Sequence, residues 1–231
     1  MTLLERYVAG EHQAVWQEIC EAGEVTPEAE AVAQELMTRV ATNVDTVVAR
    51  LEAAGYRFLH APARPPVDPD DDDLLAEAEE VVGAFPLALR ACLSTVGEVC
   101  LGGTHPEWAR TAYLFGFSGD AVLADPLWLP PAGWVAEECQ MWADDGEGEE
   151  FLLELAPDEL HKANISGSTH DISLPTDDLD PVLVGVQRRP EITLVDYLRV
   201  SLLGWGGFPG FEFEDDVPPL VRELSVGLVP F

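Results

Sequence analysis

Apolar residues recur at helical spacing across residues 27 to 54, the clearest periodic stretch of the chain. They follow one another every three or four positions and so form one stripe along a helix. The stripe consists of Val32, Leu36, Val40, Val44, Val47 and Leu51. Thr26 can cap this helix, Pro27 suits its first turn, and Gly55 can end it. The pattern therefore predicts a helix over 27–54 with one buried face.

A shorter apolar pattern precedes this helix. It predicts a helical pair that is broken at Gly10 and ends at Gly23, because glycine is a poor helix former and a common helix stop. We expect residues 1–29 to form an N-terminal helical extension that packs on a single domain spanning residues 30–231.

Further along, helical and strand-like segments are mixed. Pro86 opens a helix that Gly97 closes, residues 131–142 favour another, and Thr193 with Asp196 forms the capping-box pattern of a third. Short apolar segments with turn-rich borders predict strands. They are residues 99–101, 121–129, 151–155, 170–174 and 182–186. Helices followed by strands with one inserted helix favour an α+β fold over regular βαβ alternation.

Charge changes this picture. The chain of 231 residues carries 43 acidic and 12 basic side chains, a formal net charge of -31, and Lys162 is its one lysine. A surface so poor in cations disfavours binding of nucleic acid or of an anionic membrane leaflet. It favours a basic protein partner, but the same acidity also suits solubility alone or a salty or GC-rich habitat. Composition leaves these explanations open.

The acidity is concentrated in two segments. Residues 61–80 carry eight acids and one arginine, and residues 136–150 carry seven acids and no base. The first segment is rich in proline and then in aspartate, and it predicts an acidic loop without a helix. The second supplies candidate contacts for a basic partner, with two solvated surfaces as the alternative. These candidates are Glu137, Glu138, Asp144, Asp145, Glu147, Glu149 and Glu150.

The remaining composition points to a cytoplasmic protein. The N-terminus lacks the basic and apolar regions of a secretory signal, and no stretch approaches the roughly 18 apolar residues of a membrane span. Four cysteines occur without a Cys-x-x-Cys pair, so we expect buried, reduced thiols. No nucleotide, phosphate or metal motif is present, and we predict neither a cofactor nor a metal site.

One polar segment is a candidate site. Residues 155–171 contain Lys162 and two of the five histidines. The side chains that could converge on a small ligand are Asp125, His161, Asn164, Ser166 and His170. They suggest a hydrolase or lyase as an alternative function, since acid–base chemistry needs such groups within reach of one substrate. A turn in which these side chains bond to the backbone is the other interpretation.

A glycine-rich aromatic segment follows the last predicted helix. It reads Gly204-Trp-Gly-Gly-Phe-Pro-Gly-Phe, a composition typical of a tight, packed turn. Trp205 and Phe208 are also candidate binding residues, because aromatic side chains are common anchors of protein interfaces. The sequence leaves both possibilities open.

Several of these segments together resemble the SUKH superfamily. The resemblance rests on Phe85-Pro-Leu-Ala-Leu-Arg-Ala-Cys-Leu-Ser-Thr-Val-Gly-Glu-Val, on Asp125-Pro-Leu, and on the closing Ile192-Thr-Leu-Val-Asp-Tyr-Leu. It covers residues 30–205, and it departs from the family at the turn, which has Val96-Gly-Glu in place of Asn-Gly-Gly.

The resemblance implies an α+β scaffold in which helices flank a mostly antiparallel or mixed sheet. It also implies a non-enzymatic role, because many bacterial members of the superfamily are immunity proteins that neutralise toxins. No catalytic residues carry over. We therefore expect a protein-binding protein that recognises a basic, toxin-like partner, with an acidic housekeeping scaffold as a further alternative; the oligomeric state is left open.

Overall fold

The computed structural model describes residues 1–106, 108, 124–145, 150–163, 166–186 and 188–231. Three helices begin the chain: α1 (Leu3–Val8), α2 (His12–Ala22) and the 27-residue α3 (Pro27–Ala53). The predicted stripe of α3 is fully buried. The side chain of Thr26 caps α3, and Gly23 ends α2 in the left-handed conformation, so the predicted helix boundaries are confirmed.

The first two helices belong to the same core as the rest of the chain. Tyr7, Val15, Trp16 and Ile19 join one cluster of buried side chains that extends to the C-terminus. The indole N–H of Trp16 donates a 2.9 Å hydrogen bond to Asp180, far along the sequence. The division at residues 29 and 30 stays a prediction, and it would fall within the first turn of α3.

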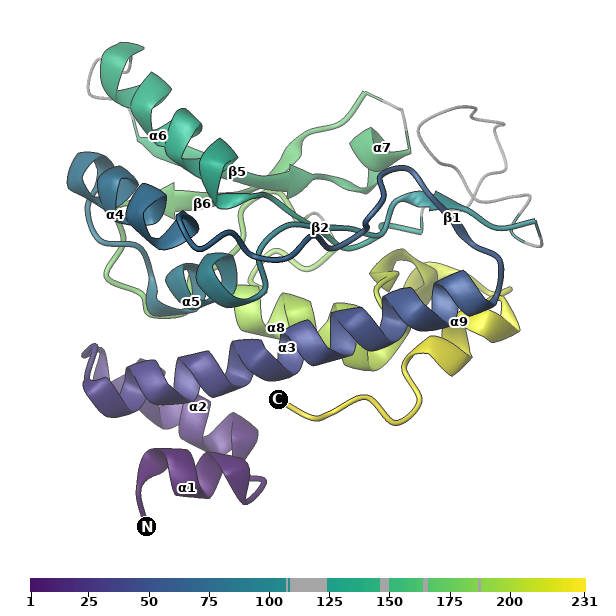
Figure 1. The fold of residues 1–231 in the computed structure, drawn as a ribbon, viewed down its shortest axis with the longest axis horizontal. Helices are drawn as coiled ribbons and strands as arrows, with labels where there is room; N and C mark the ends of the chain where they lie inside the picture. The colour runs from purple at the N-terminus through teal and green to yellow at the C-terminus, as the bar shows by residue number, and fades with distance from the viewer. Residues whose placement is uncertain (107, 109–123, 146–149, 164–165, 187) are drawn as a thin grey trace.

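The middle of the chain forms short strands and three helices. These elements are β1 (Arg57–Phe58), α4 (Asp71–Val82), α5 (Leu87–Thr95), β2 (Val99–Cys100), β3 (Gly103–Thr104), β4 (Trp128–Leu129) and α6 (Ala132–Asp145). β1 pairs with β3 and β2 pairs with β4, both antiparallel. In Figure 1, α4 and α6 lie side by side at the end of the molecule away from α9 (Pro219–Leu224).

The longest strands come next. They are β5 (Phe151–Pro157) and β6 (Thr169–Leu174), an antiparallel pair on either side of the four-residue α7 (Glu159–Lys162). Then α8 (Leu194–Arg199) continues into a π-helical turn, η1 (Val200–Gly204), and a 3₁₀ turn, η2 (Pro209–Phe213). The side chain of Thr193 caps α8, as predicted.

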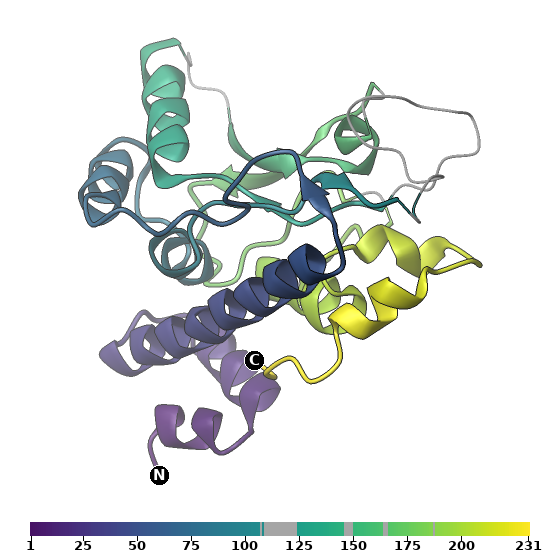
Figure 2. The ribbon, with the colours of Figure 1, turned by 45° about the vertical axis from the view of Figure 1, so that its right-hand side comes forward.

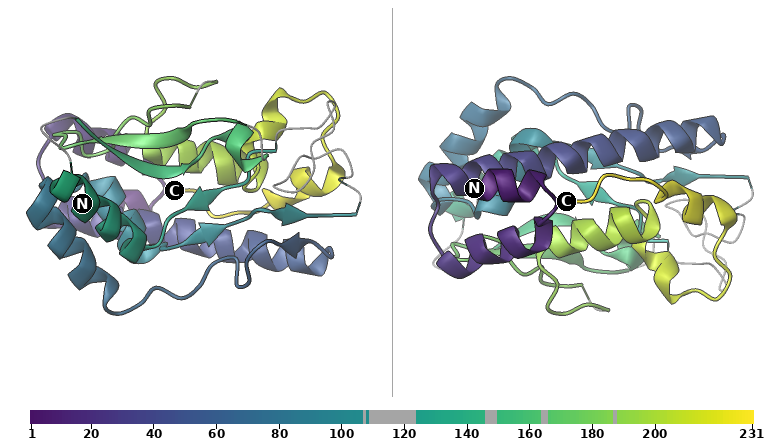
Figure 3. Two further views of the ribbon diagram at one scale, coloured as in Figure 1. Left: turned by 90° about the horizontal axis from the view of Figure 1, so that it is seen from above. Right: turned by 90° about the horizontal axis from the view of Figure 1, so that it is seen from below.

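The elements are arranged with the strands between helices. α3 and the α8–η1 helix lie side by side on one side of the strands, and α4 and α6 lie beyond the strands at one end (Figures 2 and 3). The predicted α+β class is confirmed, and the strand pairs of the described residues are all antiparallel. No helix in the described ranges combines the length and apolarity that a bilayer crossing requires. The four cysteines, all within these ranges, are free thiols, and three of them are buried.

Three predicted elements were wrong in part. The acidic segment 61–80 is not all loop, because α4 starts at Asp71. Aspartates in the first turn stabilise a helix through its dipole. Leu75, Ala78 and Val82 give α4 a buried face. Residues 182–186 make two isolated bridges instead of a strand, since a glycine with positive φ interrupts them at position 185.

The strand predicted over 121–129 is also shorter. Residues 121–123 lie outside the described ranges, and of the rest only Trp128 and Leu129 pair as a strand. Asp125 has a φ of 48°, and a proline follows it. A residue with positive φ does not fit an extended strand, and proline has no N–H to donate to a neighbouring strand.

Candidate functional site

The two acidic segments come together in the fold. α4 contains most acids of the first segment and α6 most of the described acids of the second, and these two helices pack against each other (Figure 1). We call their shared outer surface the acidic face. Its exposed carboxylates are those of Asp72, Asp73, Glu77, Glu80, Glu137 and Asp144, with Glu138 half-buried beside them.

Few cations neutralise this face. Among the described residues, Arg90 is the basic side chain that pairs with it, at 2.9 Å from Asp72 and 3.5 Å from Glu79. Arg64, the one base of the first segment, pairs with Asp45 of α3 instead. The described carboxylates of α6 make no ion pair within the residues that the structure describes. The acidic face therefore carries a concentrated, mostly uncompensated negative charge.

The remaining acidic candidates are placed as follows. Glu150 is exposed at the start of β5 and accepts a hydrogen bond from the hydroxyl of Ser173. Glu147, Glu149 and the side chain of Asp145 lie outside what the structure describes. The prediction of a charged surface thus rests on the helical part of the segment.

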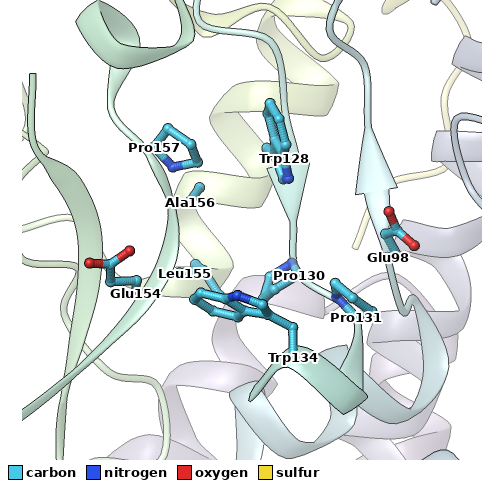
Figure 4. Close-up of a pocket in the computed structure, with 9 residues that line it drawn as sticks. All are labelled: Glu98, Trp128, Pro130, Pro131, Trp134, Glu154, Leu155, Ala156 and Pro157. Atoms are coloured by element: carbon cyan, nitrogen blue, oxygen red, sulfur yellow. The ribbon is translucent and has the colours of Figure 1, made fainter. Parts of the chain in front are cut away.

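A pocket opens at the base of α6, between β4 and β5. Its volume is about 320 Å³. Two half-buried tryptophans, Trp128 from β4 and Trp134 from α6, form much of its wall (Figure 4). Two carboxylates, Glu98 and Glu154, lie on opposite sides of it. The other lining residues are Pro130, Pro131, Leu155, Ala156 and Pro157. We call this the tryptophan–proline pocket.

A β-bulge shapes one wall of this pocket. β5 faces β6 in register up to Glu154, opposite Asp171, but Ala156 then faces His170, so Leu155 is an extra residue. In a regular strand, neighbouring side chains point to opposite faces. A bulge breaks that alternation and redirects side chains, which is why four consecutive residues, 154–157, can line the same pocket.

Among the described residues, the carboxylates and indole N–H groups of the pocket lack ion-pair and hydrogen-bond partners. Neither carboxylate makes an ion pair, and neither tryptophan indole makes a hydrogen bond, with any residue that the structure describes. Burial, together with the carboxylates of Asp171 and Glu138, raises the pKa of Glu154. Because Glu138 belongs to α6, the negative field of the acidic face reaches into the pocket.

A second cluster of charges is buried. The ammonium of Lys162, at the end of α7, lies 2.5 Å from a carboxylate oxygen of Asp125, and both residues are shielded from solvent. Burial alone would lower the pKa of Lys162, but the Asp125 carboxylate and the nearby Tyr197 outweigh it and raise that pKa. The single lysine of the chain is thus held charged inside the protein.

Tyr197 and His170 complete this buried cluster. Burial and the Asp125 carboxylate raise the pKa of Tyr197 to about 12. His170 is fully buried, and its ring nitrogens have no hydrogen-bond partner in the described ranges. Its Nε2 lies 3.9 Å from Glu159, and the facing imidazole lowers the pKa of Glu159 against the opposing effect of burial.

The cluster leaves little room for a substrate. The space beside Asp125, Glu159 and Tyr197 measures about 20 Å³, which is enough for about one water molecule. The charges of Lys162 and Asp125 neutralise each other. This arrangement suits a buried structural ion pair, although ion pairs of this kind also occur in active sites.

The polar residues predicted as one site are divided between the buried cluster and the surface. Asp125 and His170 are buried, whereas His161 and Ser166 are exposed, and Asn164 lies outside the described residues. Successive residues of a helix point about 100° apart, so Lys162 enters the core while His161 stays at the surface near Glu154, whose pKa it lowers slightly.

The segment does form a turn, but through the side chain of a residue that we did not predict. Asp158 is fully buried, and its carboxylate accepts hydrogen bonds from the backbone N–H groups of His161 at 2.7 Å and Ser168 at 2.8 Å. Through these bonds it caps α7 and closes the loop. The hydrolase or lyase alternative stays a prediction.

The aromatic candidates of the glycine-rich segment pack inward. Phe208 has an exposed fraction of 0% and contacts Tyr56 and Trp108 edge-on, so its prediction as a binding residue was wrong. Trp205 is half-buried against the core. Gly206 and Gly207 adopt positive φ, and a Cβ on Gly206 would lie 2.2 Å from Leu224. The tight, packed turn is confirmed.

Comparison with known proteins gives no further lead. No family model, no curated protein and no solved structure matches this chain. Within the described part of the chain, no group of three or more His, Cys, Asp or Glu side chains is placed to hold a metal ion.

Sequence reasoning missed the tryptophan–proline pocket. The segment Trp128-Leu-Pro-Pro-Ala-Gly-Trp134 contains both tryptophans and two of the prolines, and such a dense aromatic and proline composition was a usable signal. Only the gap between β4 and β5, which do not pair with each other, turns these residues into a pocket.

Proposed function

We propose that this protein binds a basic protein partner through the acidic face. The observation that carries the proposal is the packing of α4 against α6, which joins two acidic segments that are far apart in the sequence. If solubility were the sole role of the acidity, nothing would favour gathering it on one surface with a single pairing arginine. Basic residues of a partner would supply the missing counter-charges.

The resemblance to the SUKH superfamily supports a more specific form of this proposal. In that form the protein is a non-enzymatic immunity protein that occludes a basic toxin. Concentrated charge of one sign steers an oppositely charged partner and speeds association. Fast capture suits a protein whose task is to neutralise a toxin.

Four neutralising substitutions test the face. The face variant is Glu77→Gln, Glu80→Gln, Glu137→Gln and Asp144→Asn, all at exposed positions. These positions lie outside the first turns of α4 and α6, so favourable interactions with the helix dipoles are kept. The control variant, Glu52→Gln, Asp215→Asn, Asp216→Asn and Glu223→Gln, changes net charge equally at exposed positions near α9, at the opposite end of the molecule.

Both variants and the wild type serve as baits in extracts of the native host. We expect the wild type and the control variant to recover the same basic protein and the face variant to lose it. With that partner purified, raising NaCl from about 50 mM to about 500 mM should slow association at least tenfold, because salt screens steering. Equal recovery by all three baits, or an association rate indifferent to salt, would contradict the proposal.

The same pair of variants tests the housekeeping alternative. If the acidity serves solubility or habitat alone, the two variants lose solubility equally and differ in no binding measurement. If it serves a partner, their solubilities match and their binding differs.

A further inference from the structure

We propose that the tryptophan–proline pocket receives the guanidinium group of an arginine side chain from the basic partner. This inference deepens the proposed function and rests on it for the identity of the partner. It assigns an anchor residue to an interaction that would otherwise depend on diffuse charge alone.

The size of the pocket fits a single side chain. Sites for drug-sized ligands have volumes of about 300–1,000 Å³, and this pocket, at about 320 Å³, is at the lower end of that range. Its walls are mostly apolar, and the prolines at positions 130, 131 and 157 give them little freedom to collapse. A flat group on a flexible stem can enter such a space without rearranging the strands.

The aromatic walls favour a cation. Tryptophan has the strongest cation–π attraction of the aromatic side chains, and arginine is the cation most often found over such rings. Trp128 and Trp134 approach the pocket from β4 and α6, respectively (Figure 4). In the described part of the chain, no basic side chain lines the pocket. Among the lining residues, no protein cation therefore occupies the indole faces that a ligand cation would contact.

The two carboxylates favour arginine over lysine. Glu98 and Glu154 lie on opposite sides of the pocket, with the tryptophans between them. A guanidinium has five N–H donors arranged in a plane and can address carboxylates on more than one edge while its face rests on an indole. An ammonium is a compact, strongly hydrated point charge, and stacking is not available to it. An anionic ligand would meet two uncompensated carboxylates.

The pocket also lies beside the acidic face, because Trp134 lines the pocket and Glu138 follows it one turn later on α6. Glu138 of α6 contributes to the raised pKa of Glu154, so the two sites share an electrostatic field. A basic segment drawn to α4 and α6 would therefore find the pocket at the base of the same helix. Occupation by guanidinium would relieve the repulsion between Glu154 and its acidic neighbours.

Peptides that differ at one position test this inference. The probe is a fluorescein-labelled basic peptide of lysine, glycine and serine residues with one central arginine. Two comparison peptides carry lysine or citrulline in place of that arginine. We expect the arginine peptide to bind about 3- to 30-fold more tightly than the lysine peptide, the range of a partly desolvated cation–π contact. The citrulline peptide, which is neutral at that position, should bind more weakly than the arginine peptide.

Pocket variants locate the effect. Trp134→Leu, Glu98→Gln and Glu154→Gln should each reduce the arginine advantage, whereas the face variant should weaken all three peptides together and keep the advantage. A thermal melt of each variant confirms folding. In ¹H–¹⁵N spectra, the indole N–H signals of Trp128 and Trp134 should shift with the arginine peptide in the wild type, and that of Trp205 should stay unchanged.

The outcomes separate the two proposals. If the three peptides bind equally, with salt dependence, the acidic face binds basic partners and the pocket inference is overturned. If no peptide binds, the proposed function is overturned, and a titration with Nα-acetyl-arginine methylamide decides the pocket alone. The pocket inference is supported if this arginine compound shifts the two pocket indole signals and its citrulline analogue does not. It is overturned if the arginine compound causes no such shifts.

Discussion

Carboxylates lie in opposite environments in two regions of this protein, the acidic face and the buried cluster. On the acidic face, they are exposed, and most have no cation nearby among the described residues. In the buried cluster, Asp125 is enclosed and lies 2.5 Å from the single lysine of the chain. Outside the first turn of α4, the charges of the first region contribute little to the fold, whereas each charge of the buried pair compensates the other.

The difference follows from solvent. Exposed like charges are screened by water and salt, so they can be gathered at little cost in stability and remain available to a partner. A buried charge keeps its desolvation penalty unless an opposite charge compensates it. We therefore assign binding to the face and structural stability to the cluster, and three predictions test that assignment.

The largest effect is expected from Lys162→Met. This substitution leaves the Asp125 carboxylate buried without its counter-charge, which should lower the free energy of unfolding by about 3–5 kcal/mol. Urea denaturation measures the change. The double variant Lys162→Met with Asp125→Asn should recover most of the loss, since it removes both charges and asparagine also tolerates the positive φ at position 125. A single variant as stable as the wild type would contradict the structural assignment.

An intermediate effect is expected at alkaline pH. The pKa of Tyr197 is raised from 10.0 to about 12 in the folded protein, so its contribution to stability is complete below pH 10 and is lost as the pH rises toward 12. The raised pKa of Lys162 acts in the same direction. By about pH 11 the tyrosine alone should account for a loss of about 1 kcal/mol.

Denaturation curves between neutral pH and about pH 11 measure this loss. Tyr197→Phe should flatten the alkaline decline, and the face variant should leave its slope unchanged. If the face variant also lost less stability at alkaline pH, the acidic face and the buried cluster would be coupled. That result would contradict their assignment to separate roles.

The smallest effect is expected from the face variant on stability. Its melting temperature at low salt should equal that of the wild type or be slightly higher, because neutralisation relieves repulsion between like charges, and added salt should remove any difference. Differential scanning calorimetry at two salt concentrations provides the measurement. A clear loss of stability would mean that these carboxylates support the fold, and would contradict their assignment to binding.

Local patterns allowed much of the fold to be predicted. The apolar stripe of α3, its cap at Thr26 and the strand pattern at 151–155 and 170–174 are set by residues close in sequence, and the structure confirms them. The helical start of α4 was hidden by the prolines before it and by its own aspartates. Such a composition favours a loop, although aspartates in a first turn stabilise a helix.

The candidate site was less accessible to sequence reasoning. The charge of the face was visible, but its assembly required α4 to pack on α6. The pocket required a bulge at Leu155 and unpaired neighbouring strands, which no periodicity reports. The pairing of Asp125 with Lys162, 37 positions apart, likewise depended on how distant segments meet.

The sequence by itself determined the α+β class, the buried stripe of α3 and the excess of acid, because each depends on local spacing or composition. The tertiary structure alone decided which carboxylates are exposed together and which one is buried against a lysine. It also created the tryptophan–proline pocket. These features depend on contacts between residues that are distant in sequence, and such contacts form only when the chain closes around its core.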